Sequence, residues 1–408
     1  MNLFDPRTFS TDWEIIIIDR LNRVIDSDRL MGFAGALREA LELPVTVDVN
    51  SLEMPMGVNS SFAQFQERIL RATDLATQVF GSYDLDLYPA AAHPVEMLFS
   101  SSHIHVGTIL DETAAIRLEN QLYRFMPAFA ALAANSPVPS GMRGDYKSYR
   151  VRYQARGCTR PGSIRDPYLA QFSWGTDANA KLIGVPTLEV RITDCASSRQ
   201  FLAELGVFVA AFVHQQGTML REEPPAHAEY RDFLINRWAA AKYGLQATFH
   251  WNGATRPVVE ILDEMLASCA EALEVLGASR TTLPLIAEML HKRVCQADWA
   301  MALAARYPDH HLFASAYGKV LRHWGMFEEY LSIATPLEPV AAPDEEAVLA
   351  IHLETIGEGT HFYRTRDAMA FPPPLADEMI DCLEARGMIR REVSLERGLV
   401  LSRVQALE

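Results

Sequence analysis

Residues 98–108 read LFSSSHIHVGT, an extended run in which two histidines stand two positions apart. In a β-strand, residues i and i+2 point to the same side of the sheet. His103 and His105 therefore share one face, while Ile104 and Val106 share the opposite face. The alternation predicts a strand that packs one side into an apolar core and presents two imidazoles on the other.

Three further segments, residues 11–18, 48–55 and 187–194, read as strands with charged residues on one side. If the four strands lie in one sheet, these side chains gather on one concave face. That face holds Asp12, Glu14, Glu53, His103, His105, Glu189 and Arg191, with Asp48 as a further candidate.

A buried group of carboxylates is unstable unless its charge is neutralised. Neighbouring carboxylates repel one another, so some must take up a proton or bind a cation. Carboxylates with one imidazole suit Mg²⁺ or Mn²⁺, with phosphate oxygens completing the coordination shell. Arg191 suits a phosphate oxygen because its planar guanidinium donates two parallel hydrogen bonds. The face therefore predicts a site for a metal-bound phosphate.

Each segment alone also has a structural interpretation, and only the joint occurrence on four strands favours a site. Two other chemistries use an H-x-H strand. A cupin needs a glutamate shortly after the second histidine, where this chain has Thr108 and Ile109. A zinc amidohydrolase needs later histidines at strand ends, whereas the next one, His214, falls in an expected helix. No Gly-rich phosphate loop follows any strand, so a nucleotide must be held by another device.

The composition favours a globular protein that binds small molecules. The net charge of the 408 residues is −15. Nucleic acid is not an expected partner, because phosphate backbones attract basic surfaces. No run reaches the ~20 apolar residues of a membrane span, and the N-terminus lacks the basic and apolar regions of a signal peptide.

Cysteine usage points to a reducing compartment. The five cysteines are odd in number and form no C-x-x-C pair, so we expect reduced thiols and a cytoplasmic protein. They are Cys158, Cys195, Cys269, Cys295 and Cys382. A homodimer is the expected assembly, since two-fold dimers are the commonest oligomers.

The pattern along the chain predicts one large domain and one small one. Expected strands cover residues 13–19, 44–55, 98–108 and 186–194, and expected helices cover residues 28–43, 61–83 and 112–135. From about residue 197 to 335 the pattern is helical throughout. The large domain therefore covers residues 1–335.

A proline-rich stretch at residues 333–347 predicts a linker to a small domain at 343–408. The end of that segment predicts a helix stopped by Gly387 and then a β-hairpin that turns near residues 396–398, an arrangement compatible with a winged-helix-like appendage. Its 13 acidic and 7 basic residues give a net charge of −6. We therefore expect protein contact or oligomerisation from it rather than DNA binding.

Four motifs occur in an order that resembles a known enzyme family. They are HIHVG (103–107), ALAANSPVPSGMRGDYKSYRVR (131–152), TLEVRITD (187–194) and NRWAAAKYGL (236–245). With the acidic pair at residues 12 and 14 and AAAHPVE at 90–96, they resemble the bacterial carboxylate–amine ligases of the glutamate–cysteine ligase type 2 family, over roughly residues 8–280.

The resemblance implies an α+β protein with the glutamine-synthetase-like fold, a curved, mainly antiparallel sheet flanked by helices. It also implies that metal ions hold ATP on the sheet without a P-loop. The implied metal ligands are Asp12, Glu14, Glu53, His103 and Glu189. The implied nucleotide or phosphate contacts are His105, Lys181, Arg191, Arg237 and Lys242. The implied substrate wall comprises Asn135, Ser136, Ser148, Arg150 and Asn236, and Arg150 joins Arg191 as a catalytic group.

The chain departs from the family pattern at several places. Asp12 stands where the family usually has glutamate, and Thr46 stands where it commonly has a further glutamate. The segment between AAAHP and HIHVG is shorter than usual. The residues before TLEVR lack an arginine and leave Lys181 as the candidate cation. These differences concern the substrate side more than the metal and ATP.

We therefore expect an ATP-dependent carboxylate–amine ligase with ATP and Mg²⁺ or Mn²⁺ as cofactors. ATP phosphorylates a small carboxylic acid to an acyl phosphate, an amine attacks, and ADP and phosphate leave. Two alternatives stay open. One is a nucleotide-binding or partner-binding pseudoenzyme on the same fold, and the other is a small-molecule kinase that needs no amine.

Overall fold

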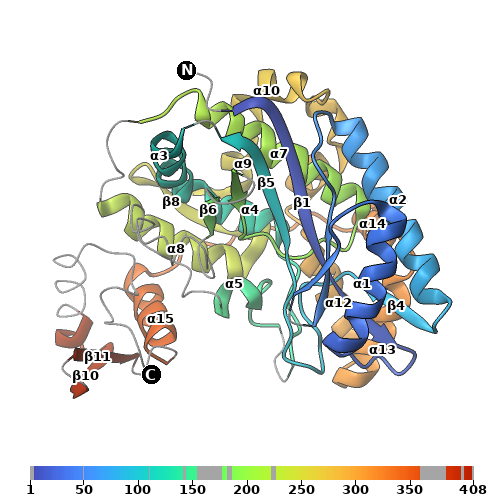
Figure 1. Cartoon of the computed structure of the whole chain (residues 1–408). Coiled ribbons are helices and arrows are strands. Elements are labelled where there is room, and N and C mark those ends of the chain that lie inside the picture. Colours follow the sequence, from blue (N-terminus) through green and yellow to red (C-terminus); the bar gives the residue numbers. More distant parts are fainter. Residues whose placement is uncertain are drawn as a thin grey trace.

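The computed structural model describes residues 4–48, 50–109, 111–140, 144–153, 177–181, 186–221, 227–358, 383–396 and 399–406. Figure 1 shows long strands at the centre, helices around them, and the C-terminal elements grouped at one side. Within the described residues, no helix is long and apolar enough to cross a membrane.

One seven-stranded sheet runs through the molecule in the order β2-β3-β1-β5-β7-β6, with β4 also beside β1. Its strands are β1 (Phe4–Asp19), β2 (Thr46–Asp48), β3 (Ser51–Pro55), β4 (Leu85–Tyr88), β5 (Ser102–Ile109), β6 (Ala178–Lys181) and β7 (Thr187–Val190). Every pairing in this sheet is antiparallel. The predicted α+β architecture with a mainly antiparallel sheet is confirmed.

The central strand is β1, which is longer than the strand predicted at residues 13–19. Residues 12–16 of β1 pair with β3, residues 8–13 pair with β5, and residues 16–19 pair with β4. The two longest partners thus hold the middle of β1 from both sides.

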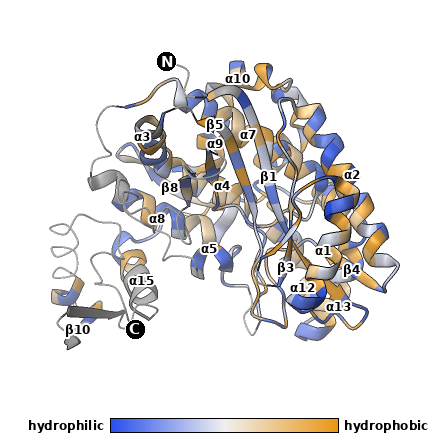
Figure 2. Ribbon diagram, in the orientation of Figure 1, coloured by the Kyte–Doolittle hydropathy of each residue, from blue (hydrophilic) through white to orange (hydrophobic). Residues whose placement is uncertain are grey.

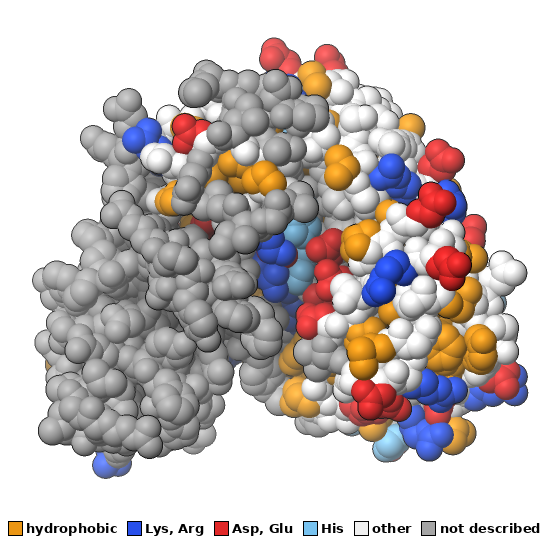
Figure 3. Space-filling model, in the orientation of Figure 1, with side chains coloured by type: hydrophobic (Ala, Val, Ile, Leu, Met, Phe, Trp, Pro, Cys, Tyr) orange, Lys and Arg blue, Asp and Glu red, His pale blue; other side chains and the backbone are white. Residues whose placement is uncertain are grey.

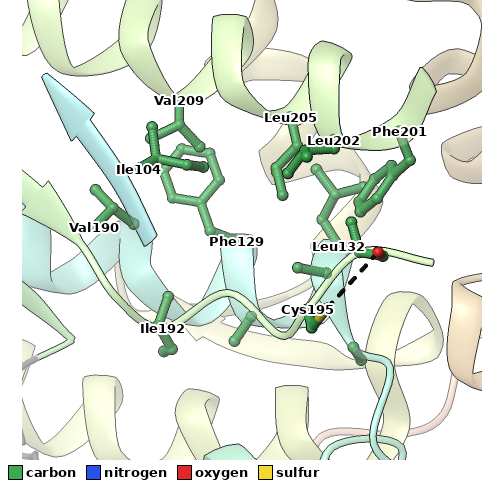
Figure 4. Close-up of a cluster of buried hydrophobic side chains, with 14 of the residues drawn as sticks. Ile104, Phe129, Leu132, Val190, Ile192, Cys195, Phe201, Leu202, Leu205 and Val209 are labelled. Carbon is green, nitrogen blue, oxygen red and sulfur yellow. Dashed lines mark hydrogen bonds between the residues drawn. The ribbon is translucent and has the colours of Figure 1, made fainter. Parts of the chain in front are cut away.

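One face of the sheet forms the apolar core. Trp13, Ile15, Ile104 and Val190 on this face are fully buried. In Figure 4, Ile104 and Val190 face Phe129 of α4 (Met126–Ala133) and side chains of α7 (Arg199–Gly217). Helix α7 is buried on nearly all sides, as expected for a helix that is apolar around its whole circumference.

Helix α2 (Phe62–Gly81) packs against α7 at a glycine. A Cβ on Gly206 would stand 2.5 Å from Cε1 of Phe65, so a larger residue would force the helices apart. Hydrophobic and hydrophilic residues both occur along α2 (Figure 2). Its buried residues recur every three or four positions, so only one side faces the core.

Several helices begin at a side chain that accepts a backbone hydrogen bond. Such N-caps satisfy an otherwise unpaired N–H of the first turn. They are Asp26, Ser61, Asp111, Ser198 and Asp309. The remaining helices of this part are α1 (Ser27–Leu41), α3 (Glu112–Leu122), α5 (Tyr149–Tyr153), α8 (His227–Tyr243), α9 (Val258–Ser268), α10 (Ala270–Val275), α11 (Pro284–Lys292), α12 (Gln296–Arg306), α13 (His310–Leu321) and α14 (Met326–Ile333).

Two boundaries differ from those expected. Residues 44–55 form a hairpin rather than one strand, because β2 and β3 pair with Asp48 opposite Ser51. The helix expected over residues 112–135 is broken by a 3₁₀ turn at Tyr123–Phe125, after which α4 begins with Pro127 in its first turn. Proline suits that position because it has no N–H to donate.

The expectation of helix throughout residues 197–335 is wrong in one segment. Strands β8 (Thr248–Trp251) and β9 (Ala254–Pro257) form a hairpin. Asn252 and Gly253 connect them with φ angles of 53° and 77°. An Asn-Gly pair with positive φ at both positions is typical of a type I′ turn, whose twist matches that of the strands.

The C-terminal elements are α15 (Glu345–Glu358) and the hairpin of β10 (Ile389–Glu396) and β11 (Leu399–Ala406). The predicted hairpin is confirmed, and residues 397 and 398, where its turn was expected, lie outside the described residues. Gly387 has a φ of 69° and donates its N–H to the carbonyl of Glu384, which suits a helix end. Most of the helix expected before Gly387 lies outside the described residues. The division into domains 1–335 and 343–408 stays a prediction.

Three cysteines lie in the described part of the chain, and all are free thiols. They are Cys195, Cys269 and Cys295. Burial raises the pKa of each to about 12, so these thiols are protonated and unreactive near neutral pH. Cys158 and Cys382 lie outside the described residues.

Candidate active site

The second face of the sheet is polar, and the register places its charged residues side by side. Glu14 lies opposite Glu53, and His105 lies opposite Glu189. Directly opposed residues of an antiparallel pair point to the same face. Figure 3 shows Lys or Arg and His side chains beside Asp or Glu side chains in a hollow of the surface. The sheet thus brings the predicted charged residues together.

The β3 end of this face is acidic. Burial, with the charges of Asp12, Glu14 and Asp48, raises the pKa of Glu53 to about 8. Burial also raises the pKa of Glu14. In the described part of the chain, neither Glu14 nor Glu53 forms an ion pair with a lysine or arginine. Carboxylates outnumber cations here, so this end can accept a positively charged ligand.

Ser101 fixes the ring of His103. The backbone N–H and the hydroxyl of Ser101 donate to Glu14 Oε2 at 2.8 and 2.5 Å, and the hydroxyl oxygen lies 2.7 Å from His103 Nε2. With Glu14 ionised, Ser101 gives its only proton to Glu14 and accepts one from Nε2. The Nδ1 atom of His103 then carries the lone pair.

The Nδ1 atom of His103 lies between two carboxylates. Nδ1 is 3.6 Å from Glu14 Oε1 and 3.4 Å from Glu189 Oε1. Burial, aided by the charge of Arg191, lowers the pKa of His103 well below its ordinary value. The ring is therefore neutral, which is the form that can ligate a metal ion.

His105 is held between β1 and β7. Its Nε2 lies 2.9 Å from Asp12 Oδ2, and its Nδ1 lies 3.0 Å from Thr187 Oγ1. Burial alone would raise the pKa of Asp12. The interactions of its carboxylate with His105 and then with Lys181 have the larger effect, so that pKa is lowered. Asp12 is therefore ionised at neutral pH.

The glycine of the HIHVG motif lets β7 approach closely. A Cβ on Gly107 would stand 2.9 Å from Cγ2 of Thr187. Any larger residue would push Thr187 away from the ring of His105 that it contacts.

The β7 end of the face is basic. Glu189 is fully buried, and its Oε1 and Oε2 lie 2.7 Å from Arg191 Nη1 and 3.1 Å from Lys181 Nζ. Burial would raise the pKa of Glu189, but His105, Arg191 and Lys181 outweigh it and lower that pKa. Arg191 and Lys181 are partly exposed, so their remaining donors can reach an anion.

Arg150 supports the strand end rather than the acidic face. It donates to the backbone carbonyls of Ile192 and Arg191 at 3.1 and 2.7 Å and lies 3.5 Å from Asp194 Oδ1. These contacts are those of a buried residue that positions the backbone of Arg191. The catalytic role expected for Arg150 stays a prediction.

The residues expected at the substrate wall gather around Asp194. The N–H of Asn135 and the hydroxyl of Ser136 donate to Asp194 Oδ2 at 2.8 and 2.9 Å. The hydroxyl of Ser136 also lies 3.2 Å from that of Ser148. These polar groups are buried, and their bonds fix the loop that follows α4.

Three expected site residues on α8 make structural contacts. Arg237 donates from Nε and Nη2 to Asp177 at 2.7 and 3.0 Å. The amide of Asn236 bonds to the backbone of His250, and Lys242 lies 4.9 Å from the ring of Trp238. In the described residues, neither Asn236 nor Lys242 bonds to an acid or imidazole of the sheet face. Their binding roles stay predictions.

The donor set fits a divalent cation in kind. Carboxylate oxygens of Glu14 and Glu53 and the lone pair of His103 are ligands that Mg²⁺ and Mn²⁺ accept. The 3.4 and 3.6 Å separations around Nδ1 exceed the ~3.0 Å expected between adjacent octahedral ligands. Accordingly, among the residues described, no group of three or more acids, histidines or cysteines has metal-ligand geometry. The side chains must draw together slightly to ligate an ion.

Two residues at the site were not anticipated from the sequence. Ser101 stands two residues before His103, so the same alternation that pairs the histidines also indicates Ser101. Asp194 lies within the TLEVRITD motif, but its contacts with Asn135 and Arg150 depend on how distant segments meet. No local pattern reveals them.

Solved ligases have the same architecture. The structure is similar to the glutamate–cysteine ligase of Francisella tularensis in complex with AMP, with a TM-score of 0.57 and 9% identity, over 91% of this chain and 98% of that one. It is also similar to the ligase PafA in complex with the prokaryotic ubiquitin-like protein Pup, with a TM-score of 0.52 and 13% identity, over 98% and 87% of the two chains. The fold is the glutamine-synthetase-like fold, as predicted.

The family follows from sequence. The model of glutamate–cysteine ligase family 2 (GCS2) matches residues 91–157 and 181–317, half of the chain. The chain belongs to this family.

Curated relatives cover more of the chain at low identity. A protein of Sorangium cellulosum named "Putative glutamate--cysteine ligase 2" is 29% identical over 231 residues, which are 51% of this chain and 60% of that protein. A protein of the same name from Cupriavidus metallidurans is 22% identical over 376 residues, which are 78% of this chain and 96% of that protein.

Proposed function

We propose that the protein is an ATP-dependent carboxylate–amine ligase that works through an acyl phosphate. A substrate carboxylate attacks the γ-phosphorus of ATP, and the bond to the β-phosphate oxygen breaks to release ADP. The amine nitrogen then attacks the acyl carbon, the bond to the phosphate oxygen breaks, and the amine loses a proton. The products are an amide, ADP and phosphate.

The observation that carries the proposal is the division of charge along the sheet face. The β3 end has an excess of carboxylates, marked by the raised pKa of Glu53, and the β7 end carries Arg191 and Lys181. A metal-bound phosphate matches both ends, because its cation suits the acids and its oxygens suit the bases.

The metal would be held by the acidic residues of the sheet face. Its proposed ligands are Asp12, Glu14, Glu53, His103 and Glu189. Bound there, Mg²⁺ or Mn²⁺ would neutralise charge on the phosphate groups. Fixed strands suit this role, because preorganised charges need no rearrangement as the reaction proceeds.

Arg191 and Lys181 would contact the transferring phosphate. Both are bonded to Glu189 on one side and partly exposed on the other. Arg191 keeps donors available for a phosphate oxygen, and its charge would stabilise the negative charge that develops during transfer. Arg150, bonded to the backbone at Arg191, would keep that side chain in place.

No protein nucleophile is required. The three described cysteines are buried and protonated, and the hydroxyl of Ser101 is already bonded to Glu14. Direct transfer between bound substrates therefore suits this site better than a covalent enzyme intermediate.

The nucleotide proposal draws support from the family and the fold. The similar Francisella ligase was solved with AMP, and glutamate and cysteine are the substrates that give the family its name. The acid and the amine of this protein are to be identified by assay, because its substrate-side segments differ from the family pattern.

A coupled phosphate-release screen of amino acids and other small acids against amines tests the proposal. We expect ADP and phosphate as products, and a hydroxamate when hydroxylamine replaces the amine. Pyrophosphate and AMP would contradict the mechanism. A stable phosphorylated acid formed without amine would indicate a kinase, and ATP binding without turnover across the panel would indicate a pseudoenzyme.

A further inference from the structure

Asn179 of β6 is a buried amide that the proposed reaction leaves unused. It lies directly opposite Glu189, so its side chain points to the polar face of the sheet. Only 1% of the residue is exposed. Neither its Oδ1 nor its Nδ2 has a hydrogen-bond partner among the described residues.

The polar residues two positions before and two positions after Asn179 are paired. Asp177 accepts two hydrogen bonds from Arg237, and Lys181 lies 3.1 Å from Glu189. Even the outward backbone N–H of Ala180 is satisfied, by Glu119. Asn179 therefore stands out in a segment whose other polar groups are bonded.

Folding does not explain this amide. A buried polar group without a hydrogen bond destabilises the folded protein, whereas an apolar residue at the same position carries no such penalty. Leucine has the same number of side-chain heavy atoms as asparagine, branched at the same position, and it suits a buried strand. The sequence thus retains an amide at a cost in stability, as expected of a group that bonds to a ligand.

Asn59 shows what a structural amide looks like in this molecule. It is fully buried, and its Nδ2 donates to the carbonyls of Phe9, Met56 and Gly57. These bonds hold the turn after β3 against β1. The two asparagines are equally buried but differ in whether the protein itself uses the amide donor.

We propose that Asn179 is a ligand-recognition residue of the ligase site. Its amide binds a group that offers a hydrogen-bond donor and an acceptor side by side. The proposal rests on the proposed function, because two ligands of that reaction carry such a group. One is the edge of adenine, which asparagine pairs with through one donor and one acceptor, and the other is the ammonium and carboxylate of an amino-acid substrate.

The position of Asn179 suits either source. It lies on the edge strand, next to Glu189 and on the side away from the acidic end. A ligand whose phosphate is bound by Arg191 and Lys181 would place its remaining atoms near this edge. Asn179 would therefore bind the part of the ligand that lies beyond the phosphate, while Arg191 and Lys181 bind the phosphate itself.

Stability of the ligand-free protein separates recognition from structure. We expect Asn179→Leu to raise or preserve the melting temperature, with Asn179→Ala as a smaller second variant. The matched control Asn59→Leu should lower the melting temperature, since it removes the three hydrogen bonds that Nδ2 donates. If both Asn179 variants lower it as much as the control does, the amide is structural and the proposal is overturned.

Calorimetric titration with ATP and Mg²⁺ identifies the source. A loss of at least tenfold in ATP affinity in Asn179→Leu assigns the contact to adenine. Unchanged ATP affinity with a tenfold higher KM for the acid or the amine assigns it to that substrate. In either case Asn179→Ser, which keeps a donor and an acceptor, should recover part of the loss. Unchanged ATP affinity and unchanged KM values overturn the proposal.

Failure of the ligase proposal would be visible separately. Wild-type protein that binds ATP but releases no phosphate overturns the ligase reaction alone. The role of Asn179 is then decided by direct titration of wild type and Asn179→Leu with ATP and with the panel of acids. Equal affinities in both proteins overturn it.

Discussion

The carboxylate of Asp12 contacts His105, although its backbone lies directly opposite His103. The register pairs Asp12 with His103, yet Asp12 Oδ2 lies 2.9 Å from His105 Nε2. This diagonal contact leaves His103 to face Glu14 and Glu189. The two imidazoles therefore have different surroundings, since His105 contacts Asp12 whereas His103 lies between Glu14 and Glu189.

The first prediction concerns these histidines. We expect His103→Ala and His105→Ala to weaken Mg²⁺-dependent ATP binding by at least tenfold, since each removes a contact at the proposed metal-phosphate site. The free energy of unfolding without ligand should change by less than ~2 kcal/mol, the loss typical of a packed core residue. Calorimetry with and without ATP measures both. Lost stability with unchanged ATP affinity would show a purely structural role.

The second prediction concerns pH. The pKa of Glu53 is raised from 4.5 to about 8, so between these values the folded protein holds a proton that the unfolded chain releases. Stability is then greatest at low pH and falls as pH rises toward 8. We expect Glu53→Gln to reduce this fall in a thermal-melting series from pH 5 to 9.

Mg²⁺ should act on the same group. A cation that binds ionised Glu53 stabilises the protein more at pH 8 than at pH 5, and Glu53→Gln should lose most of that difference. Glu119 is the matched control, because burial also raises its pKa to about 8 but it lies on α3 against β6. Glu119→Gln should flatten the pH profile and keep the Mg²⁺ response. If Mg²⁺ stabilises Glu53→Gln as it stabilises the wild type, Glu53 is not a metal ligand.

The third prediction separates charge from volume at Glu189. Glu189→Gln keeps the shape of the side chain but loses the charge that binds Arg191 and Lys181. We expect turnover to fall at least 100-fold with the fold intact, because both cations are partly exposed and stay hydrated. Phosphate release at saturating Mg²⁺ and circular dichroism are the measurements. Activity within tenfold of wild type would exclude an essential role.

The fourth prediction distinguishes two arginines. Arg150→Ala leaves Asp194 as an uncompensated buried charge, so we expect a loss of about 3 kcal/mol or more in stability. Arg191→Ala removes a partly exposed group and should cost less than about 1 kcal/mol while abolishing turnover. Denaturant unfolding and phosphate release compare them. A stable, inactive Arg150→Ala would instead support the catalytic role predicted for it.

The fifth prediction concerns the C-terminal segment. All strands of the site lie before residue 200. Helix α15 packs against α8, and its Glu345 lies 2.5 Å from Arg231 and 3.3 Å from His250. Deletion of residues 343–408 should leave ATP affinity within threefold of wild type. A truncated protein that is insoluble or does not bind ATP would show that the segment belongs to the catalytic fold.

Local patterns anticipated most of the sheet face. Alternation alone placed His103, His105, Asp12 and Glu14 on one side, because side-chain direction in a strand depends only on position parity. The same rule would have indicated Ser101. It could not show that Asp12 would reach His105 rather than the residue opposite, since that choice depends on the rotamers of neighbouring side chains.

Other features depend on tertiary contacts. The bond of Arg150 to the backbone at Arg191 joins segments 41 residues apart, and no spacing in the sequence specifies it. The β8–β9 hairpin, in contrast, has a local sequence signal, because Asn252 and Gly253 form a typical turn pair. The helical pattern of the surrounding residues led to a helix prediction there instead. The sequence also could not indicate that the amide of Asn179 lacks a hydrogen bond. That observation required the positions of all the surrounding described residues.

The position of the acids on β1 has a consequence for how the site meets its ligands. Asp12 and Glu14 lie midway along a 16-residue strand that β3 and β5 hold from both sides. Amide hydrogens in this stretch should exchange with solvent only when the whole molecule unfolds. The backbone that carries these carboxylates therefore keeps its place through every turnover, and adaptation to different ligands is left to side-chain rotations and to the edge strands.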